Sequence, residues 1–161
     1  MSEYSCVRVL AAIALTLGLP THGTFVPGQS LGGVRLGMTS AQVRHAWGNA
    51  YGVCRGCPRT TWYFTYAPFD PHGAGVELQR GRVVAVFTLW SPQGWQTPQS
   101  ALALGNDAAR VTLVEGPLPS VACRNYAALV RRTRRAVSAF YLVEGKLWGF
   151  GLTRPGVPVC R

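Results

Sequence analysis

The sequence predicts an α+β fold built from two tandem units, each a short helix followed by an antiparallel sheet. Three observations support this prediction. A segment that opens with Leu-Gly occurs at residues 36–48 and again at residues 104–116, and a period of this size is typical of a duplicated supersecondary unit. Each copy has the cap and the terminal glycine of a short helix. Runs of β-branched and aromatic residues, separated by turn residues, follow both copies, as expected for strands.

The chain opens with an export signal, which we place at residues 1–23. Residues 9–19 are apolar and uncharged behind Arg8. This run is too short to anchor the chain across a bilayer, which takes about 20 residues. Thr21 and Gly23 are small residues that suit a peptidase cutting before Thr24. We therefore expect an exported protein, secreted or located in the cell envelope, with no membrane span in its mature form.

Each unit then begins with a helix. In the first unit, Thr39 and Gln42 have the spacing of a capping box, and Gly48 ends the helix. In the second unit, Asp107 occupies the capping position and Gly116 ends the helix. The helices are expected to be two to three turns long and to pack on the strands that follow them.

The strands form a meander in each unit. Six strands are expected, at residues 60–66, 74–79 and 82–90 in the first unit and at residues 126–132, 136–143 and 146–152 in the second. Residues 80–81 and 144–145 supply two-residue hairpin turns. These turns lie in similar segments at an offset of 64, compared with 68 for the helical segment. The units span residues 24–95 and 96–161 of one compact mature domain, and residues 91–100 join them.

The helical segment also carries a resemblance to a known family. Gly37-Met38-Thr39, Val43 and Gly48, together with the duplication and the export signal, resemble the tandem-repeat β-lactamase inhibitor proteins and the related small outer-membrane assembly lipoproteins. This resemblance implies an inhibitor-like fold in which the two sheets form a concave surface that grips a partner. The chain departs from the inhibitor pattern in its Cys-x-x-Cys motif and its basicity. It also lacks the lipid-attachment cysteine of the lipoproteins.

Four cysteines remain after the signal: Cys54, Cys57, Cys123 and Cys160. An even number in a small exported domain predicts two disulfides with three connectivities open. We favour Cys54–Cys57 with Cys123–Cys160, because each bond then stays within one half of the chain. The Cys54–Cys57 spacing is also that of a thiol-disulfide oxidoreductase, although Pro58 and a strand follow where such enzymes have a helix. Zinc binding with His45 or His72 is disfavoured because no second close cysteine pair exists.

Aromatic and basic residues are the candidate partner-binding groups. Trp62, Phe64 and Tyr66 alternate along one strand and therefore share a face, which Trp90, Tyr141, Trp148 and Phe150 extend or support from below. Large rings of this kind serve as interface anchors, although each is also a natural core residue. The densest charge cluster contains Arg131, Arg132, Arg134 and Arg135. It is either a solvated hairpin tip or a contact for an anionic partner.

Composition and motifs favour a protein that binds over one that catalyses. Only 6 of the 161 residues are acidic, against 16 basic ones, so few carboxylates remain for acid–base chemistry. No nucleophile elbow, phosphate loop or nucleic-acid-binding motif occurs. We expect a secreted, non-catalytic, inhibitor-like binding protein without a cofactor or metal, whose partner is a protein or an anionic envelope component. The alternatives are an oxidoreductase using Cys54 and Cys57, and an envelope protein anchored by charge.

Overall fold

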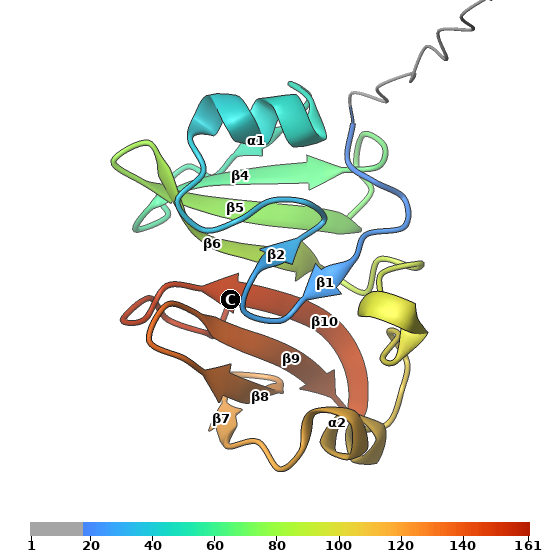
Figure 1. Cartoon of the computed structure of the whole chain (residues 1–161). Helices are drawn as coiled ribbons and strands as arrows, with labels where there is room; N and C mark the ends of the chain where they lie inside the picture. The colour runs from blue at the N-terminus through green and yellow to red at the C-terminus, as the bar shows by residue number, and fades with distance from the viewer. Residues whose placement is uncertain (1–17) are drawn as a thin grey trace, which may run out of the picture.

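A computed structural model describes residues 18–161 of the chain. Most of the expected export signal, including Cys6, lies outside the described residues. Described residues form a mixed α/β structure with two helices on one face of an eight-stranded antiparallel sheet (Figure 1). None of the helices in this part of the chain is long and apolar enough to cross a membrane.

The elements alternate as short strands, one helix and a meander, and then a helix and a second meander. In chain order they are β1 (Phe25–Val26), β2 (Ser30–Leu31), α1 (Ser40–Trp47), β3 (Gly52–Val53), β4 (Thr60–Thr65), β5 (Gly73–Gln79), β6 (Arg82–Leu89), a 3₁₀ turn (Pro98–Ser100), α2 (Ala108–Glu115), β7 (Ser120–Ala122), β8 (Ala127–Arg132), β9 (Val137–Val143) and β10 (Lys146–Thr153). The sheet order is β3-β4-β5-β6-β10-β9-β8-β7, so each half contributes four strands. The two halves meet where β6 pairs with β10.

Local sequence signals determine the first helix and the hairpins. The Thr39 hydroxyl accepts a hydrogen bond from the Gln42 backbone N–H at 3.2 Å, and the Gln42 side chain accepts one from the Thr39 N–H at 2.8 Å. This is the predicted capping box. In the β9–β10 hairpin, Glu144 and Gly145 have φ of 49° and 75°. Two consecutive positive φ values are those of the type I′ turn, whose twist matches that of paired strands.

The second helix begins after Asp107, as predicted, but that side chain does not cap it. No hydrogen bond joins the Asp107 carboxylate to the first turn of α2; instead its Oδ1 lies 2.6 Å from Lys146 Nζ at the start of β10. The nearby lysine attracts the carboxylate more strongly than the helix N–H groups do. The capping role predicted for Asp107 is therefore wrong, although the helix start is right.

The six expected strands are present with boundaries within one residue, and the shorter ones were not predicted. The sheet edges β3 and β7 contain two and three residues, and β1 and β2 contain two each. Runs of this length have no measurable alternation, so periodicity does not detect them. Short edge strands also limit edge-to-edge association with other chains.

The main core lies between the helices and the sheet and contains residues from both halves. Phe25 precedes the first helix, yet its ring lies 4.9 Å from Phe150 and 5.5 Å from Phe140, measured between centroids. Trp95, in the segment expected to join the two units, is 1% exposed and belongs to the same core. Residues 91–100 therefore contribute to packing as well as connecting the halves.

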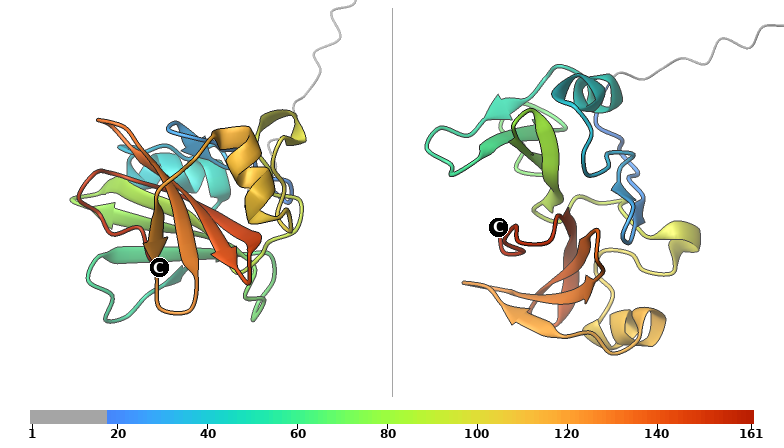
Figure 2. Two further views of the ribbon diagram at one scale, coloured as in Figure 1. Left: turned by 90° about the horizontal axis from the view of Figure 1, so that it is seen from below. Right: turned by 60° about the vertical axis from the view of Figure 1, so that its left-hand side comes forward.

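No helix of the described residues covers the opposite face of the sheet, which we call the helix-free face. A smaller apolar cluster lies there, and it includes Phe87, Tyr141 and Val159. Val159 belongs to residues 154–161, which we call the C-terminal arm. Figure 2 shows the chain end on the side of the sheet away from α1 and α2. Much of the helix-free face is therefore either covered by the C-terminal arm or exposed to solvent.

Candidate functional site

The aromatic residues predicted to form one surface divide between the two faces of the sheet. Trp62 and Phe64 share a face of β4, but that face packs against α1, where the Trp47 ring lies 5.2 Å from that of Phe64. Their side chains are 8% and 1% exposed. Because the helix covers them, Trp62 and Phe64 are core residues, and the prediction that they contact a partner is wrong. Phe150 is fully buried in the same core.

Tyr66 follows β4 and also faces the covered side. Its hydroxyl donates a hydrogen bond to the Pro20 carbonyl at 3.1 Å and accepts one from the Trp95 indole N–H. Partial burial raises the pKa of Tyr66 above its ordinary value, although the bond from Trp95 opposes this effect. Tyr66 therefore connects the segments around Pro20 and Trp95, which are distant in the sequence.

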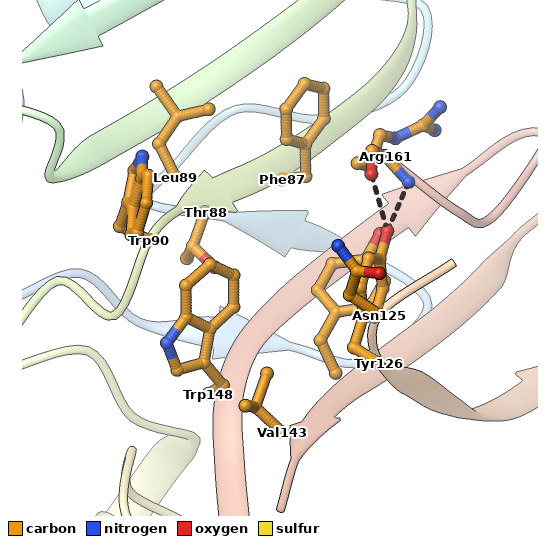
Figure 3. A pocket seen from close by; sticks show the side chains of 10 residues that line it. Phe87, Thr88, Leu89, Trp90, Asn125, Tyr126, Val143, Trp148 and Arg161 are labelled. Atoms are coloured by element: carbon orange, nitrogen blue, oxygen red, sulfur yellow. Dashed lines mark hydrogen bonds between the residues drawn. The ribbon is translucent and has the colours of Figure 1, made fainter. Parts of the chain in front are cut away.

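The three remaining aromatic residues of the predicted set lie together on the helix-free face. Trp90, Tyr141 and Trp148 line a cavity of about 500 Å³, which we call the aromatic cavity (Figure 3). Its other lining residues are Phe87, Thr88, Leu89, Asn125, Tyr126, Val143 and Arg161. Tyr141 is 3% exposed, so it belongs to the packed floor, whereas Trp90 is 58% exposed.

The aromatic cavity opens where β6 and β10 separate. Their ladder pairs Phe87 with Gly151 and continues from there only toward Ala85 and Thr153. In the other direction the Thr88 hydroxyl accepts a hydrogen bond from the Phe150 N–H at 3.0 Å, in place of a backbone partner. A side chain thus satisfies the backbone at the point where the strands part. The strands can then separate without leaving this N–H unpaired.

A β-bulge in β10 turns Trp148 into this opening. The pairing of β10 with β9 changes register between Leu147 and Gly149, and bulges of this kind redirect the side chain that they carry. Gly149 is required here because a Cβ would overlap the Thr88 hydroxyl. A Cβ on Gly151 would likewise overlap the Tyr141 hydroxyl. Because both positions are glycine, the Thr88 and Tyr141 hydroxyls lie close to the β10 backbone and no β10 side chain fills the cavity there.

Trp90 forms the opposite wall in a strained backbone conformation. Its φ of 53° lies in the left-handed region, which is costly for a residue with a large side chain. The Trp90 and Trp148 rings lie 5.9 Å apart at 62°, close to an edge-to-face arrangement. A large, exposed ring held by a strained backbone indicates a functional role.

The C-terminal arm closes one side of the aromatic cavity. The Tyr141 hydroxyl donates to the Val159 carbonyl at 2.9 Å, and the Tyr126 hydroxyl donates to the Arg161 carbonyl at 2.8 Å. The Arg161 N–H donates to the same Tyr126 hydroxyl (Figure 3). Burial raises the pKa of Tyr141 well above the ordinary tyrosine range, so the hydroxyl stays protonated and remains a donor.

A second cavity, of about 380 Å³, lies on the same face and is lined by two arginines. We call it the arginine cavity; Arg59 and Arg161 both contact the Glu77 carboxylate there, at 3.6 and 3.1 Å. The Arg161 guanidinium also lies over the Phe87 ring, 5.0 Å from its centroid. Arg161, Phe87 and Leu89 line both cavities, so the two cavities adjoin.

The arginine cluster predicted for partner binding lies at the other end of the same strands. Arg131 donates to the Glu115 carbonyl at 2.8 Å and forms an ion pair with its carboxylate at 2.7 Å, so it attaches β8 to α2. Arg132, Arg134 and Arg135 are exposed around the β8–β9 turn. The aromatic cavity instead uses the end of β9 and the residues before β8. The structure therefore does not bring the predicted basic and aromatic groups together.

Both predicted disulfides are present, Cys54–Cys57 and Cys123–Cys160. The first lies between β3 and β4, where no helix N-terminus is available to stabilise a thiolate. The second joins the C-terminal arm to the residue after β7. No cluster of three or more histidine, cysteine or acidic residues occurs within residues 18–161 that would hold a metal ion.

No histidine is among the described residues that line the aromatic cavity. His45 is exposed on α1, and His72 pairs with Asp70 in the β4–β5 loop, with 2.7 Å between ring Nδ1 and carboxylate Oδ1. The His72 backbone N–H and then its ring lower the pKa of Asp70 by hydrogen bonding to the carboxylate. Ser91 lines another cavity with His72, but no hydrogen bond joins them in the described chain. The aromatic cavity therefore offers an apolar contact surface with polar groups at its edge.

Sequence reasoning missed the residues that shape the cavities. Thr88, Asn125 and Tyr126 lie outside every motif, and the pairing of Arg59 and Arg161 with Glu77 joins segments far apart in the chain. One signal was present in the sequence: two glycines, Gly149 and Gly151, interrupt a run that otherwise reads as a strand. Strand glycines of this kind indicate a bulge or a close approach.

Comparisons with known proteins support the fold and leave the function open. Neither a protein-family model nor a curated protein matches the sequence. An extracellular protein containing an SCP domain from Bacillus anthracis is similar in structure, with a TM-score of 0.55 over 74% of this chain at 11% identity. This chain spans 44% of that protein. A DUF4309 family protein, YjgB of Bacillus subtilis, has a TM-score of 0.55 over 72% of this chain and 78% of its own, at 16% identity.

Proposed function

We propose that this is a secreted, non-catalytic binding protein that holds a protein partner on the helix-free face of its sheet. Export is supported by the predicted signal, the two disulfides and the extracellular neighbour. One observation carries the binding role: Trp90, strained and 58% exposed, faces Trp148 across the aromatic cavity. Rigid, partly exposed tryptophans around a pocket are typical of interface hot spots.

The aromatic cavity suits binding better than catalysis. Among the described residues that line it, the Thr88 hydroxyl is engaged with Phe150, and the Tyr126 and Tyr141 hydroxyls hold the C-terminal arm. A nucleophile activated by a neighbouring base is not found among these groups. Asn125 at the exposed edge offers an amide for a hydrogen bond to a partner backbone.

The inhibitor-like, tandem-repeat architecture remains part of this proposal. Its support is that equivalent hydrogen bonds recur in the two halves. The Gly37 N–H donates to the Val83 carbonyl at 2.8 Å, and the Gly105 N–H donates to the Leu147 carbonyl at 2.7 Å. Gly48 and Gly116 end the two helices with φ of 85° and 80°. A duplicated unit accounts for these matches.

The test removes one cavity wall without adding backbone strain. Because glycine accepts a positive φ readily, Trp90→Gly should leave the free energy of unfolding within about 1 kcal/mol of wild type. The variant protein, immobilised, is used to capture partners from culture fluid and envelope extract of the producing cells. Losing a hot-spot tryptophan should weaken the captured partner's affinity roughly 30-fold. Trp148→Ala should act in the same direction.

The matched control is Leu113→Ala. Leu113 is 75% exposed on α2, on the opposite side of the sheet, so its truncation should leave capture unchanged. If Trp90→Gly retains every partner at wild-type affinity while the fold is intact, the proposed binding role of the aromatic cavity is wrong.

A further inference from the structure

The two cavities of the helix-free face differ in chemistry, and they adjoin. The aromatic cavity is apolar with tryptophan walls, whereas the arginine cavity contains a cluster of charged groups. Phe87, Leu89 and Arg161 line both, so a ligand segment can occupy the two at once. Such a segment would carry a large apolar side chain beside a charged one.

The side chains of the charged cluster supply one carboxylate for two guanidinium groups, and Nε and Nη2 of Arg161 are buried without a hydrogen-bond partner. Glu77 contacts both Arg59 and Arg161, and the side chains of Glu77 and Arg161 are each only 13% exposed. Among the described residues that line either cavity, Glu77 is the only one with an acidic side chain. A positive charge with little access to water is costly unless an anion is near it. A second carboxylate entering the arginine cavity would therefore be stabilised by this excess.

Among residues 18–161, no acidic side chain is free to serve as that second anion, and the main-chain oxygen of Arg161 accepts a hydrogen bond from the Tyr126 hydroxyl. Asp70, Asp107 and Glu115 are already paired with His72, Lys146 and Arg131. Glu144 lies in the β9–β10 turn and lines neither cavity. A second copy of the chain is disfavoured as the occupant, because each copy carries a net charge of +10.

We propose that the paired cavities bind an acidic segment of a partner protein. A large apolar side chain of that segment enters the aromatic cavity, and a neighbouring carboxylate reaches Arg59 and Arg161. This inference rests on the binding function proposed above and adds the chemistry of the partner. Charge-assisted hydrogen bonds from guanidinium to carboxylate give both orientation and affinity. The apolar anchor supplies contact area next to them.

The probes are three blocked peptides of equal length, titrated into the full chain. The first has one tryptophan flanked by two glutamates on each side, the second has lysines in place of the glutamates, and the third has alanine in place of the tryptophan. Binding is followed by NMR through the indole N–H signals of Trp90 and Trp148, each assigned with a tryptophan-to-phenylalanine variant. We expect the acidic tryptophan peptide to bind at least about tenfold more tightly than either of the others, the ratio that one charge-assisted hydrogen bond gives. Its affinity should fall with added salt.

Arg59→Gln distinguishes binding at this site from nonspecific attraction of the acidic peptide by the net positive charge of the protein. It should weaken the acidic peptide about tenfold and leave the basic peptide unchanged. Arg135→Gln removes the same charge from the exposed β8–β9 turn and should have no such effect. Equal binding of the acidic and basic peptides would overturn the inference, as would equal losses from the two arginine variants. If both tryptophan peptides bind equally and Trp90→Gly abolishes that binding, the acidic preference is wrong while the proposed binding function stands.

Discussion

At the scale of single residues, alternation along a strand predicts which side chains share a face, but it does not identify the face. Trp62 and Phe64 lie on the same side of β4, as their spacing requires, and the side they share is the covered one. The sequence predicts that Trp90 extends or supports the same surface; in the structure it lies on the other face, because φ at this residue is positive. Sequence alone does not report a backbone reversal at a residue other than glycine.

Tyr141 makes the fold sensitive to alkaline pH. Its pKa is raised in the folded state by burial, whereas in the unfolded chain it titrates near the ordinary value of 10.0. Stability from this group is therefore fully present below about pH 10 and decreases as the pH rises above that value, because only the unfolded state then releases the proton.

Tyr141→Phe should separate this effect from the hydrogen bond to Val159. At neutral pH the variant loses about 0.5–1.5 kcal/mol of unfolding free energy, the usual contribution of one hydrogen bond. Above pH 10 the difference from wild type should shrink, since phenylalanine has no proton to release. Urea unfolding at a series of pH values checks this. Parallel decreases of the two proteins above pH 10 would show that Tyr141 is not the titrating group.

At the scale of elements, local signals predicted both helix starts, the hairpins and the long strands. The capping box of Thr39 and the turn at Glu144 and Gly145 act within four residues, so the sequence contains all the information they need. The C-terminal arm is different. Its place on the sheet depends on the Tyr141, Tyr126 and Glu77 side chains, which are distant in sequence. No local pattern specifies such contacts, so the arginine cavity was not predicted.

The two disulfides should differ in what they contribute to stability. Cys123–Cys160 spans 37 residues and attaches the C-terminal arm, whereas Cys54–Cys57 spans three. Loop-closure entropy gives about 4 kcal/mol for the longer loop and about 2 kcal/mol for the shorter. Replacing both cysteines of each pair with serine, followed by denaturant unfolding, measures the two losses. The expectation fails if the Cys54–Cys57 pair costs as much as the other.

At the scale of the whole molecule, the predicted units are halves of one structure. β6 and β10 join the halves into one sheet, and Phe25 from the first half packs against Phe140 and Phe150 of the second. Each half has fewer than 75 residues, which leaves little apolar surface to bury alone. The sequence predicted the order of elements within each half. It did not predict the shared core, because the contacts between halves leave no periodic signal.

Separate expression of residues 24–95 and 96–161 tests this interdependence. Neither fragment should unfold cooperatively on heating, because each would expose a strand edge and half of the core. Mixing the fragments should restore a cooperative transition and the near-ultraviolet circular dichroism of packed aromatic side chains. A fragment that melts cooperatively by itself would show that the halves are independent domains.

The pairing of Phe87 with Gly151 has a further consequence. Under the proposed duplication these residues are equivalent, at the offset of 64, and an approximate two-fold axis passes between them. On one side of this axis Trp90 and Trp148 border an open cavity; their equivalents on the other side are Arg154 and Val84, joined by a backbone hydrogen bond of 2.9 Å. The two ends of the junction between β6 and β10 therefore differ: one borders a cavity, and the other is closed by a backbone hydrogen bond. A partner meets one recess instead of two equal ones, so the complex should have one-to-one stoichiometry and a single direction of the bound segment.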